Sequence, residues 1–504
     1  MAVITNNFTP PMAGLTTDNI QLVTNNRKQE LTNHKKMEGT KNLIRITDSL
    51  SEQLVVFKKS KKPLRLFVCG PTVYDNAHIG HARTYLVYDA FVKFLRSQKY
   101  AVSYIQNITD VDDRIVARAK EQKTTFATIA KTYQQAYHRA EKELNITACN
   151  AYPKASKHIK EIIAQIQILI KKGAAYETKH GVYFEVKKFL PYGKLSKQNL
   201  DALRPGWRIE PDPSKRDPLD FALWKKESQQ PYWKSPWGTG RPGWHIEDTA
   251  ITQKTFGAQY DIHGGASELK FPHHESEIAQ QETASGKHPM VRAWMHTGVL
   301  FVAGQKMSKS LKNFITINDF VREQGPNVLR YMILSHHYRS PIDYTPLLVQ
   351  SARAGFQTLT HALDKIRFAQ EQKKTLIKKH IASSLITRWE KDFVAALSND
   401  FNTPKAFAVL FECANTIHTH GTFLDKKTAL RIEQFLEMSL KTLGFIVHKK
   451  QPIPVKIRKV AQKRELFRAN KQFMQADVLR DAIHALGYDV DDTPQGPFVY
   501  KIRV

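Results

Sequence analysis

The sequence has few cysteines, no long apolar segment and a shortage of acidic residues. Three cysteines in 504 residues cannot form a disulfide framework, and the odd number favours a reducing, cytoplasmic compartment. No stretch approaches the ~18 apolar residues that a membrane-spanning helix requires, so no membrane partner is expected. Residues 1–43 are polar, lack the apolar core of a secretory signal and contain one arginine, which disfavours a transit peptide. They predict a disordered leader.

The shortage of acids leaves a large positive charge. Asp and Glu total 47 against 76 Lys and Arg, so the formal net charge is +29. Such a field favours a polyanionic partner, and nucleic acid is the first candidate. A lineage with a lysine-rich proteome would give the same composition, so charge alone does not identify the partner.

The hydrophobic pattern predicts an α/β fold. RLFVCG (65–70) has the pattern of a buried strand, residues 81–98 have helical spacing, and AVSYIQNIT (101–109) is a second strand. This order is a βαβ unit, which predicts a parallel, Rossmann-like sheet with ligands at the carboxyl ends of its strands. Further strands are expected at 258–265 and 295–304.

We expect this α/β domain to span 44–345, with an insertion at about 150–242 that is rich in Pro, Gly and Trp. A helical bundle should follow at 346–447. A small mixed module with a hairpin should close the chain at 448–504. Its first part, 448–473, holds nine Lys and Arg against one acid, which is typical of a nucleic-acid contact.

Two short motifs carry basic groups beside expected strands. HIGH (78–81) lies where the first strand's loop enters a helix, and the imidazoles of His78 and His81 with free backbone N–H groups would form an anion site there. Gly80 would let a flat ring approach the backbone. KMSKS (306–310) offers Lys306 and Lys309 to phosphate oxygens. Either motif alone is weak, since chance or a solvated basic turn would also explain it.

Together the two motifs resemble the signature pair of class I aminoacyl-tRNA synthetases. From about residue 44 to the end, the chain is similar to the cysteinyl-tRNA synthetases, whose motifs occur in the same order. The matching segments are FVCGPTVYDNAHIGHART (67–84), NITDVDD (107–113), RPGWHIE (241–247), DIHGG (261–265), FPHHESEIAQ (271–280), KMSKS (306–310), DFNTP (400–404) and DTPQGP (492–497).

The resemblance implies one zinc ion per chain. The family's ligands are two cysteines, a histidine and a glutamate, and the matching positions here are Cys69, Asp248, His273 and Glu277. The chain departs from the family at Asp248, which replaces the second cysteine. A carboxylate is an accepted zinc ligand and carries the same charge as a thiolate, but it is a harder donor. The open position of the metal would bind the substrate thiolate and so distinguish cysteine from serine.

The resemblance also assigns residues around the metal. Thr109, Trp244 and His263 match residues that line the cysteine pocket in the family. His245 and Glu247 match no zinc ligand there, so a packed or hydrogen-bonded role is expected for both. His78, Gly80, His81 and Lys309 match groups that contact ATP, and His78, His81, Lys306 and Lys309 would act in catalysis.

The implied activity is the ATP- and Mg²⁺-dependent ligation of L-cysteine to tRNA(Cys) through a cysteinyl-adenylate, by a monomer whose helical and basic C-terminal regions bind the anticodon. Two alternatives remain. A cysteine ligase on the same scaffold could use an amino sugar, as in mycothiol biosynthesis, but such enzymes lack a long C-terminal region. An inactive paralogue could bind RNA alone, with Asp248 as its first lesion, although it would have no need of both HIGH and KMSKS.

Overall fold

The computed structural model describes most of the chain, namely residues 43–198, 213–307, 311, 313–371, 383–449 and 452–502. The chain from Ile44 to Val504 forms one compact unit. The predicted leader lies outside the described residues except for Leu43, and Lys309 also lies outside them. None of the described helices is both long and apolar enough to cross a membrane.

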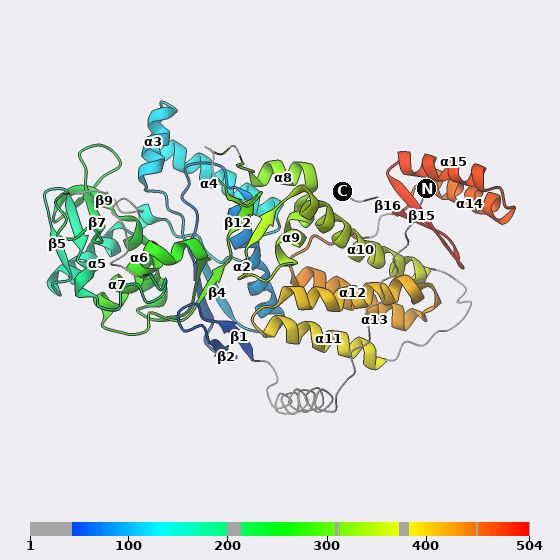
Figure 1. Cartoon of the computed structure of the whole chain (residues 1–504), viewed down its shortest axis with the longest axis horizontal. Helices are drawn as coiled ribbons and strands as arrows, with labels where there is room; N and C mark the ends of the chain where they lie inside the picture. The colour runs from blue at the N-terminus through cyan, green and yellow to red at the C-terminus, as the bar shows by residue number, and fades with distance from the viewer. Residues whose placement is uncertain are drawn as a thin grey trace, which may run out of the picture. The chain divides into compact units, whose positions relative to one another are not determined.

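A four-stranded parallel sheet holds the site (Figure 1). Its strands stand in the order β11, β10, β3, β4, and each neighbouring pair is parallel. They are β3 (Leu64–Val68), β4 (Val102–Gln106), β10 (Tyr260–Ala266) and β11 (Val291–Thr297). Helix α2 (Ile79–Ser97) connects β3 to β4. The prediction of an α/β fold with a parallel, Rossmann-like sheet is confirmed.

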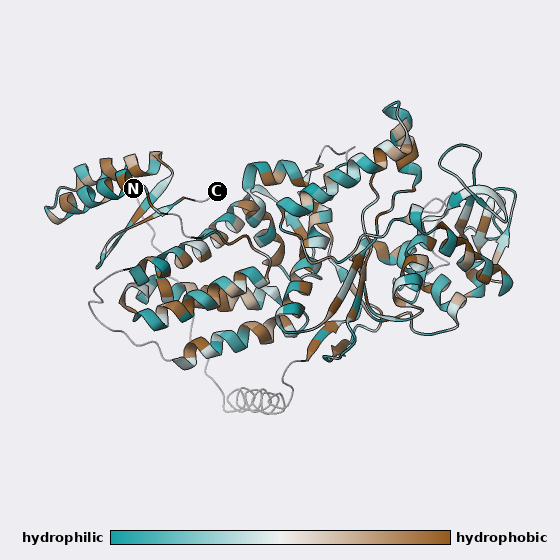
Figure 2. Cartoon of the chain, turned by 180° about the vertical axis from the view of Figure 1, so that it is seen from behind, coloured by the Kyte–Doolittle hydropathy of each residue, from teal (hydrophilic) through white to brown (hydrophobic). Residues whose placement is uncertain are grey.

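The alternation of side chains along β3 directs them into two different cores. Leu66 and Val68 pack in the larger core with α2, whereas Phe67 and Cys69 pack in a smaller core with two later helices. These helices are α6 (Trp244–Phe256) and α7 (Glu275–Ser285). Hydrophobic residues follow the central strands in Figure 2. The alternation therefore places the Cys69 thiol on the side of the sheet where α6 and α7 pack.

The segment between the two halves of the sheet holds helices and a second, antiparallel sheet with the strand order β5, β6, β7, β9, β8. Its elements are α3 (Asp113–Glu121), α4 (Phe126–Glu143), the short helix η1 (Ala155–Lys157), α5 (Ile159–Lys171), β5 (Ala175–Glu177), β6 (Gly181–Phe184), η2 (Val186–Lys188), β7 (Phe221–Lys226), β8 (Trp233–Ser235) and β9 (Gly238–Pro242). A strand pair precedes the parallel sheet, formed by β1 (Ile44–Thr47) and β2 (Leu54–Phe57).

The stretch 295–304, expected to form one strand, contributes to two strands in different sheets. The first is β11, and the second joins the small sheet of β12 (Leu300–Val302), β13 (Gln305–Lys306) and β14 (Ile342–Tyr344). The break falls at Gly298, whose N–H donates to the Tyr338 carbonyl. A Cβ there would lie 2.3 Å from the Ser340 carbonyl oxygen. This close approach depends on a distant segment, which an apolar run cannot reveal.

Helices dominate the rest of the chain. They are α8 (Ile317–Gln324), α9 (Pro326–Leu334), α10 (Pro346–Glu371), α11 (Ser383–Ser398), α12 (Thr403–His420), the short η6 (Gly421–Phe423) and α13 (Lys426–Thr442). The C-terminal module has α14 (Val455–Ala469), α15 (Phe473–Ala485) and a hairpin of β15 (Tyr488–Thr493) and β16 (Gly496–Lys501). Buried side chains of α10 to α13 share one core with those of α2, whereas the module has a small core of its own. The expected helical region and mixed C-terminal module are both present.

Candidate active site and metal site

The HIGH turn begins α2, and its two histidines cap the helix. The His78 side chain accepts a hydrogen bond from the Gly80 N–H at 3.1 Å, and the His81 side chain accepts one from the His78 N–H at 3.2 Å. Both bonds use Nδ1 as the acceptor, so each neutral ring carries its proton on Nε2. The cap therefore fixes the tautomer in which both imidazoles have an N–H donor left over.

Burial keeps these rings neutral. It lowers the pKa of His78 from 6.5 to about 4 and lowers the pKa of His81 well below its usual value. The expectation that the first turn also offers free backbone N–H groups is wrong. The Ile79 N–H donates to the Ile315 carbonyl, and the His81 N–H donates to the His78 carbonyl. An anion at this turn would depend on the imidazole donors.

The first lysine of KMSKS lies at the same cavity as the HIGH turn. Backbone hydrogen bonds join the chain around the HIGH turn to residues that follow KMSKS, one from the Ile79 N–H to the Ile315 carbonyl and one from the Ile317 N–H to the Ala77 carbonyl. Lys306 forms an ion pair with Glu268. Glu268 belongs to the short helix η4 (Ser267–Leu269), which follows β10. The carboxylate therefore holds this lysine beside the HIGH histidines.

The cavity measures about 540 Å³ and opens at the carboxyl ends of β3 and β10, where the βαβ pattern predicts a ligand site. The HIGH turn, the 70–74 loop, the start of α6 and the turn before α7 contribute to its walls. The residues that line it include His78, His81, Glu268, Lys306, Trp244 and His273. Groups suited to phosphates and groups near the predicted zinc ligands thus border one space.

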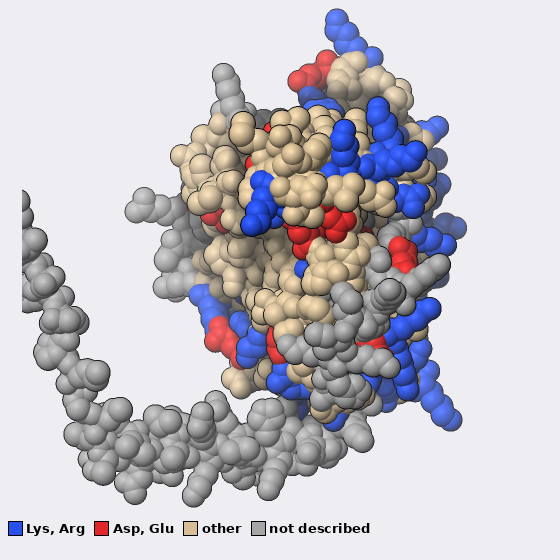
Figure 3. All heavy atoms as spheres, turned by 90° about the vertical axis from the view of Figure 1, so that its right-hand side faces the viewer, with Lys and Arg blue, Asp and Glu red and all other residues tan. Residues whose placement is uncertain are grey.

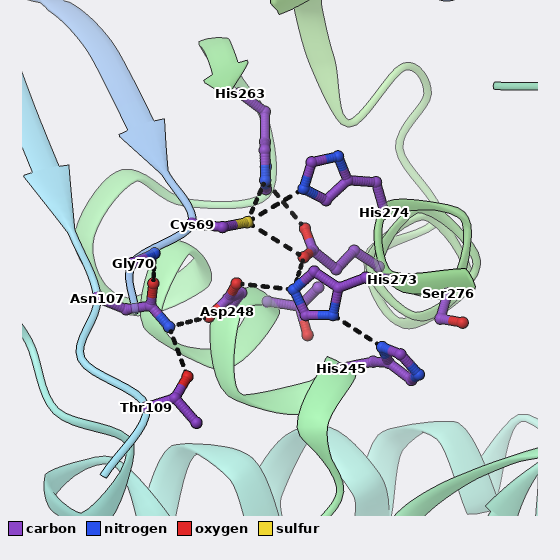
Figure 4. Close-up of polar contacts among 12 residues, drawn as sticks. Cys69, Gly70, Asn107, Thr109, His245, Asp248, His263, His273, His274 and Ser276 are labelled. Carbon is purple, nitrogen blue, oxygen red and sulfur yellow. Dashed lines mark hydrogen bonds and ion pairs between the residues drawn. The ribbon is translucent and has the colours of Figure 1, made fainter. Parts of the chain in front are cut away.

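The four zinc ligands implied by the resemblance lie together in the fold. Cys69, Asp248, His273 and Glu277 are buried, and one ligand atom from each lies within 4.8 Å of the others. Figure 4 shows Cys69, Asp248 and His273 converging on one point. His273 Nε2 lies 3.1 Å from Asp248 Oδ2 and 2.9 Å from Glu277 Oε1. Cys69 Sγ lies 3.9 Å from the same Glu277 oxygen. His273 precedes α7 in the short helix η5 (Lys270–His274), and this turn brings it beside Glu277.

The electrostatics of this cluster suit a cation. Burial, together with the carboxylates of Glu277 and Asp248, raises the pKa of the Cys69 thiol. Burial also acts to lower the pKa of His273, but the two carboxylates outweigh it and raise this pKa to about 9. Glu277 Oε2 is buried without a hydrogen-bond partner among the described residues. A divalent cation would pair with this oxygen and ionise the thiol, and the donor set is one that zinc accepts.

Two residues of the cluster were missed by sequence reasoning. Asn107 donates a hydrogen bond to Asp248 and accepts one from the Gly70 N–H, so it fixes the carboxylate. His274 lies one position beyond the predicted ligand His273, and its Nε2 is 3.1 Å from Cys69 Sγ. The only signals in the sequence were the place of Asn107 in the NITD motif and the histidine doublet.

The remaining predicted residues are divided between the cavity and the interior. Trp244 lines the cavity and stacks on His273, with ring centroids 4.2 Å apart. Thr109 and His263 are buried and are not among the residues that line the cavity. His245 Nδ1 lies 2.8 Å from His273 Nδ1, so His245 holds the His273 ring through the nitrogen that does not face Asp248 and Glu277. Burial raises the pKa of Glu247, which lies outside the cluster.

Comparison with known proteins places this geometry in a family. Residues 55–354 match the tRNA synthetases class I (C) catalytic domain, and residues 392–447 match the DALR domain. The cysteine–tRNA ligase of Thermococcus onnurineus is 39% identical over 475 residues, which cover 92% of this chain and 100% of the relative. That of Thermococcus kodakarensis is 41% identical with the same coverage, and that of Coxiella burnetii is 40% identical over 90% of this chain and 98% of the relative.

Solved structures share the fold at low sequence identity. Methionyl-tRNA synthetase of Mycobacterium tuberculosis, in complex with methionyl-adenylate, superimposes with a TM-score of 0.55 and 12% identity, covering 76% of this chain and 89% of that one. The LeuRS of Agrobacterium radiobacter superimposes with a TM-score of 0.55 and 10% identity, covering 77% of this chain and 85% of that one. The matched domains and the extent of the curated relatives lead to one conclusion. The chain belongs to the class I aminoacyl-tRNA synthetases, in the cysteine–tRNA ligase family.

Proposed function

We propose that the protein ligates L-cysteine to tRNA(Cys) in two steps that use ATP. A carboxylate oxygen of cysteine bonds to the α-phosphorus of ATP, the bond from that phosphorus to the bridging oxygen breaks, and pyrophosphate leaves. A hydroxyl of the terminal tRNA ribose then attacks the acyl carbon, and AMP leaves. The observation that carries this proposal is the shared cavity, which borders both phosphate-binding groups and the predicted metal ligands.

The HIGH histidines would act as neutral hydrogen-bond donors to the phosphates. Their Nδ1 atoms are occupied by the helix cap, so each Nε2–H remains for an oxygen of ATP. Donors placed where charge develops lower the barrier to nucleotidyl transfer. Lys306, now paired with Glu268, would add a full positive charge, and Lys309 would do the same by resemblance. ATP would bring Mg²⁺ as its counter-ion.

The amino-acid end of the cavity would select the thiol. Cys69, Asp248, His273 and Glu277 are the residues that would hold zinc. When bound, zinc supplies a position that coordinates a thiolate far better than an alcohol. Trp244 stacks on His273 at the cavity wall and would cover the side chain of the substrate. Selection of cysteine over serine would then depend on coordination, because S and O differ too little in size for packing to discriminate.

The C-terminal region would bind the tRNA backbone. On α14, Lys456, Arg458, Lys459 and Lys463 are exposed. Figure 3 shows Lys and Arg gathered along one edge of the face seen from the side of α14 and α15 in Figure 1. Two other arginines of α14, Arg464 and Arg468, pair with Asp492 of the hairpin and so hold the module together. Exposed lysines that face solvent are available to neutralise phosphates.

The test is a cysteine-dependent ATP–pyrophosphate exchange assay followed by acceptor assays. We expect exchange with cysteine, little exchange with serine, and acylation of tRNA(Cys). Exchange with transfer to an amino sugar but not to tRNA would identify the small-molecule ligase instead. RNA binding without any exchange would identify an inactive paralogue.

A further inference from the structure

Cys69 and Glu277 also belong to a second group of potential metal ligands. Cys69, His263, His274 and Glu277, here called the deep set, are all buried, and their ligand atoms lie within 4.8 Å of one another. The other group, Cys69, Asp248, His273 and Glu277, is called the cavity set. His273 lines the cavity, whereas no member of the deep set is among its lining residues.

The spacing of the deep set fits a tetrahedral ion. Cys69 Sγ lies 3.3 Å from His263 Nε2, 3.1 Å from His274 Nε2 and 3.9 Å from Glu277 Oε1. His263 Nε2 lies 3.3 Å from Glu277 Oε2. With Zn–N and Zn–O bonds of ~2.0 Å and a Zn–S bond of ~2.3 Å, tetrahedral ligand atoms stand roughly 3.3–3.6 Å apart. The three distances that involve the histidine nitrogens lie close to this range, and one of the two Glu277 oxygens would complete the set.

The outer nitrogens of both deep histidines are held by further residues. His263 Nδ1 lies 2.6 Å from the Tyr260 hydroxyl, and His274 Nδ1 lies 2.8 Å from His296 Nε2. A histidine that binds metal through Nε2 carries a proton on Nδ1, and such a proton is normally donated to an acceptor behind the ring. Tyr260 and His296 are placed to accept these protons. The Nε2 atoms of His263 and His274 both contact the Cys69 sulfur (Figure 4).

Charge also favours the deep set. A zinc ion with one thiolate, one carboxylate and two neutral imidazoles is electrically neutral, whereas the cavity set leaves one excess negative charge. An uncompensated charge in a fully buried site is costly. Zinc also binds imidazole readily, so a second nitrogen in place of a carboxylate suits it. The buried Glu277 Oε2, which has no hydrogen-bond partner among the described residues, faces this position.

We infer that zinc in the substrate-free protein is held by the deep set, Cys69, His263, His274 and Glu277. The two sets share Cys69 and Glu277, so a single ion would be held by one set or the other and not by both at once. Of the residues in the two sets, only His273 lines the cavity, so the cavity set is the one that a substrate thiol would reach. The inference does not depend on tRNA charging and would hold for any acceptor of cysteine.

X-ray absorption at the zinc edge of the full-length protein tests this directly, because it counts sulfur and imidazole ligands. We expect one sulfur and two imidazoles in the absence of substrate. One imidazole with two carboxylate oxygens, or no stoichiometric zinc after incubation with zinc alone, would overturn the inference. Adding cysteine without ATP should bring in a second sulfur. Its absence would count against the thiol-selecting role proposed above and leave the deep set unaffected.

Adjacent histidines provide a matched pair of variants. His274→Gln should weaken zinc affinity in the substrate-free protein by at least ~10-fold, measured by competition with a chelator, while His273→Gln should change it less than about 3-fold. His296→Gln, which keeps every ligand, should weaken it by about 10–100-fold. The reverse ranking of the first two would contradict the deep set. If a variant fails to fold by circular dichroism, the ligand count of the unmodified protein decides alone.

Discussion

Asn107 donates a hydrogen bond from Nδ2 to Oδ1 of Asp248, while the other carboxylate oxygen, Oδ2, lies 3.1 Å from His273 Nε2. The amide therefore holds the carboxylate with one oxygen occupied and one directed at the cluster. Asn107 is itself fixed, because its oxygen accepts the Gly70 N–H. Asn107 thus fixes the Asp248 carboxylate at the position where the resemblance implies a cysteine.

Replacing this acid should move the metal towards the cavity. In Asp248→Cys, the cavity set would contain two thiolates, which zinc prefers over a carboxylate donor. We expect two sulfurs at the zinc edge without substrate, zinc affinity at least equal to that of the unmodified protein, and retained preference for cysteine over serine. Asp248→Asn is the control, because the asparagine side chain has the shape of the aspartate side chain and supplies no thiolate. A single sulfur in Asp248→Cys would show that position 248 does not reach the metal.

His78→Asn should separate the structural role of this histidine from its catalytic role. Asparagine is among the best helix N-caps, so the cap and the stability of α2 should be retained. The shorter side chain cannot present the Nε2–H donor, and loss of one such donor typically lowers a rate by ~10²–10³-fold. We expect this loss in the maximal rate of pyrophosphate exchange, with the melting temperature little changed. A raised KM for ATP at an unchanged maximal rate would mean that His78 binds only the ground state.

Acid should destabilise the protein partly through the HIGH turn. The pKa of His78 falls from 6.5 in the unfolded chain to about 4 in the folded one, because the ring is buried. Between these values the unfolded state binds a proton that the native state excludes, so stability decreases as pH falls through this window. In His78→Asn this contribution is absent. Thermal melting followed from pH 6.5 to about 4 should therefore show a shallower decline than in the unmodified protein, and parallel curves would refute the assignment.

Lys306 should matter for rate more than for stability. Its pair with Glu268 is partly exposed, and such pairs contribute roughly 0.2–1 kcal/mol to stability. Glu268→Gln removes the carboxylate charge and leaves the lysine in place, so the free energy of unfolding should fall by no more than this amount. Lys306→Ala should instead lower the rate of exchange by ~10²–10³-fold, since it removes a charge where negative charge develops. Equal rates in Lys306→Ala and the unmodified protein would exclude this lysine from the reaction.

Removal of residues 452–504 should leave adenylate formation intact and weaken tRNA charging. The module has a small core of its own, and it packs on α10 through Phe498 and Tyr500, so its loss uncovers part of that helix but removes no residue of the main core. Changing Lys456, Lys459 and Lys463 to alanine in the full chain is the finer test. The salt dependence of tRNA affinity should become shallower by roughly 0.7–0.9 log units per log unit of salt for each phosphate that the variant no longer neutralises. Unchanged charging by the shortened protein would place the tRNA-binding surface elsewhere.

The sequence alone determined the βαβ order and the positions of both motifs, and the resemblance named the four residues of the cavity set, which the fold brings together. These depend on local signals: apolar runs bounded by glycine, helical spacing, and motifs whose order along the chain is specific to one family. It also indicated the helical region and the basic C-terminal module, because charge and turn residues are visible in composition.

Only the tertiary structure showed what depends on distant segments. Gly298 divides an apolar run because residues 338–340 pass close to it. The first turn of α2 has no free N–H at Ile79 because Ile315 occupies it. Helices α10 to α13 share a core with α2, so a cut after residue 345 would open that core. His274 faces Cys69 only because β3 sends alternate side chains to opposite sides of the sheet and α7 packs on one of them, a relation between elements that no local pattern encodes.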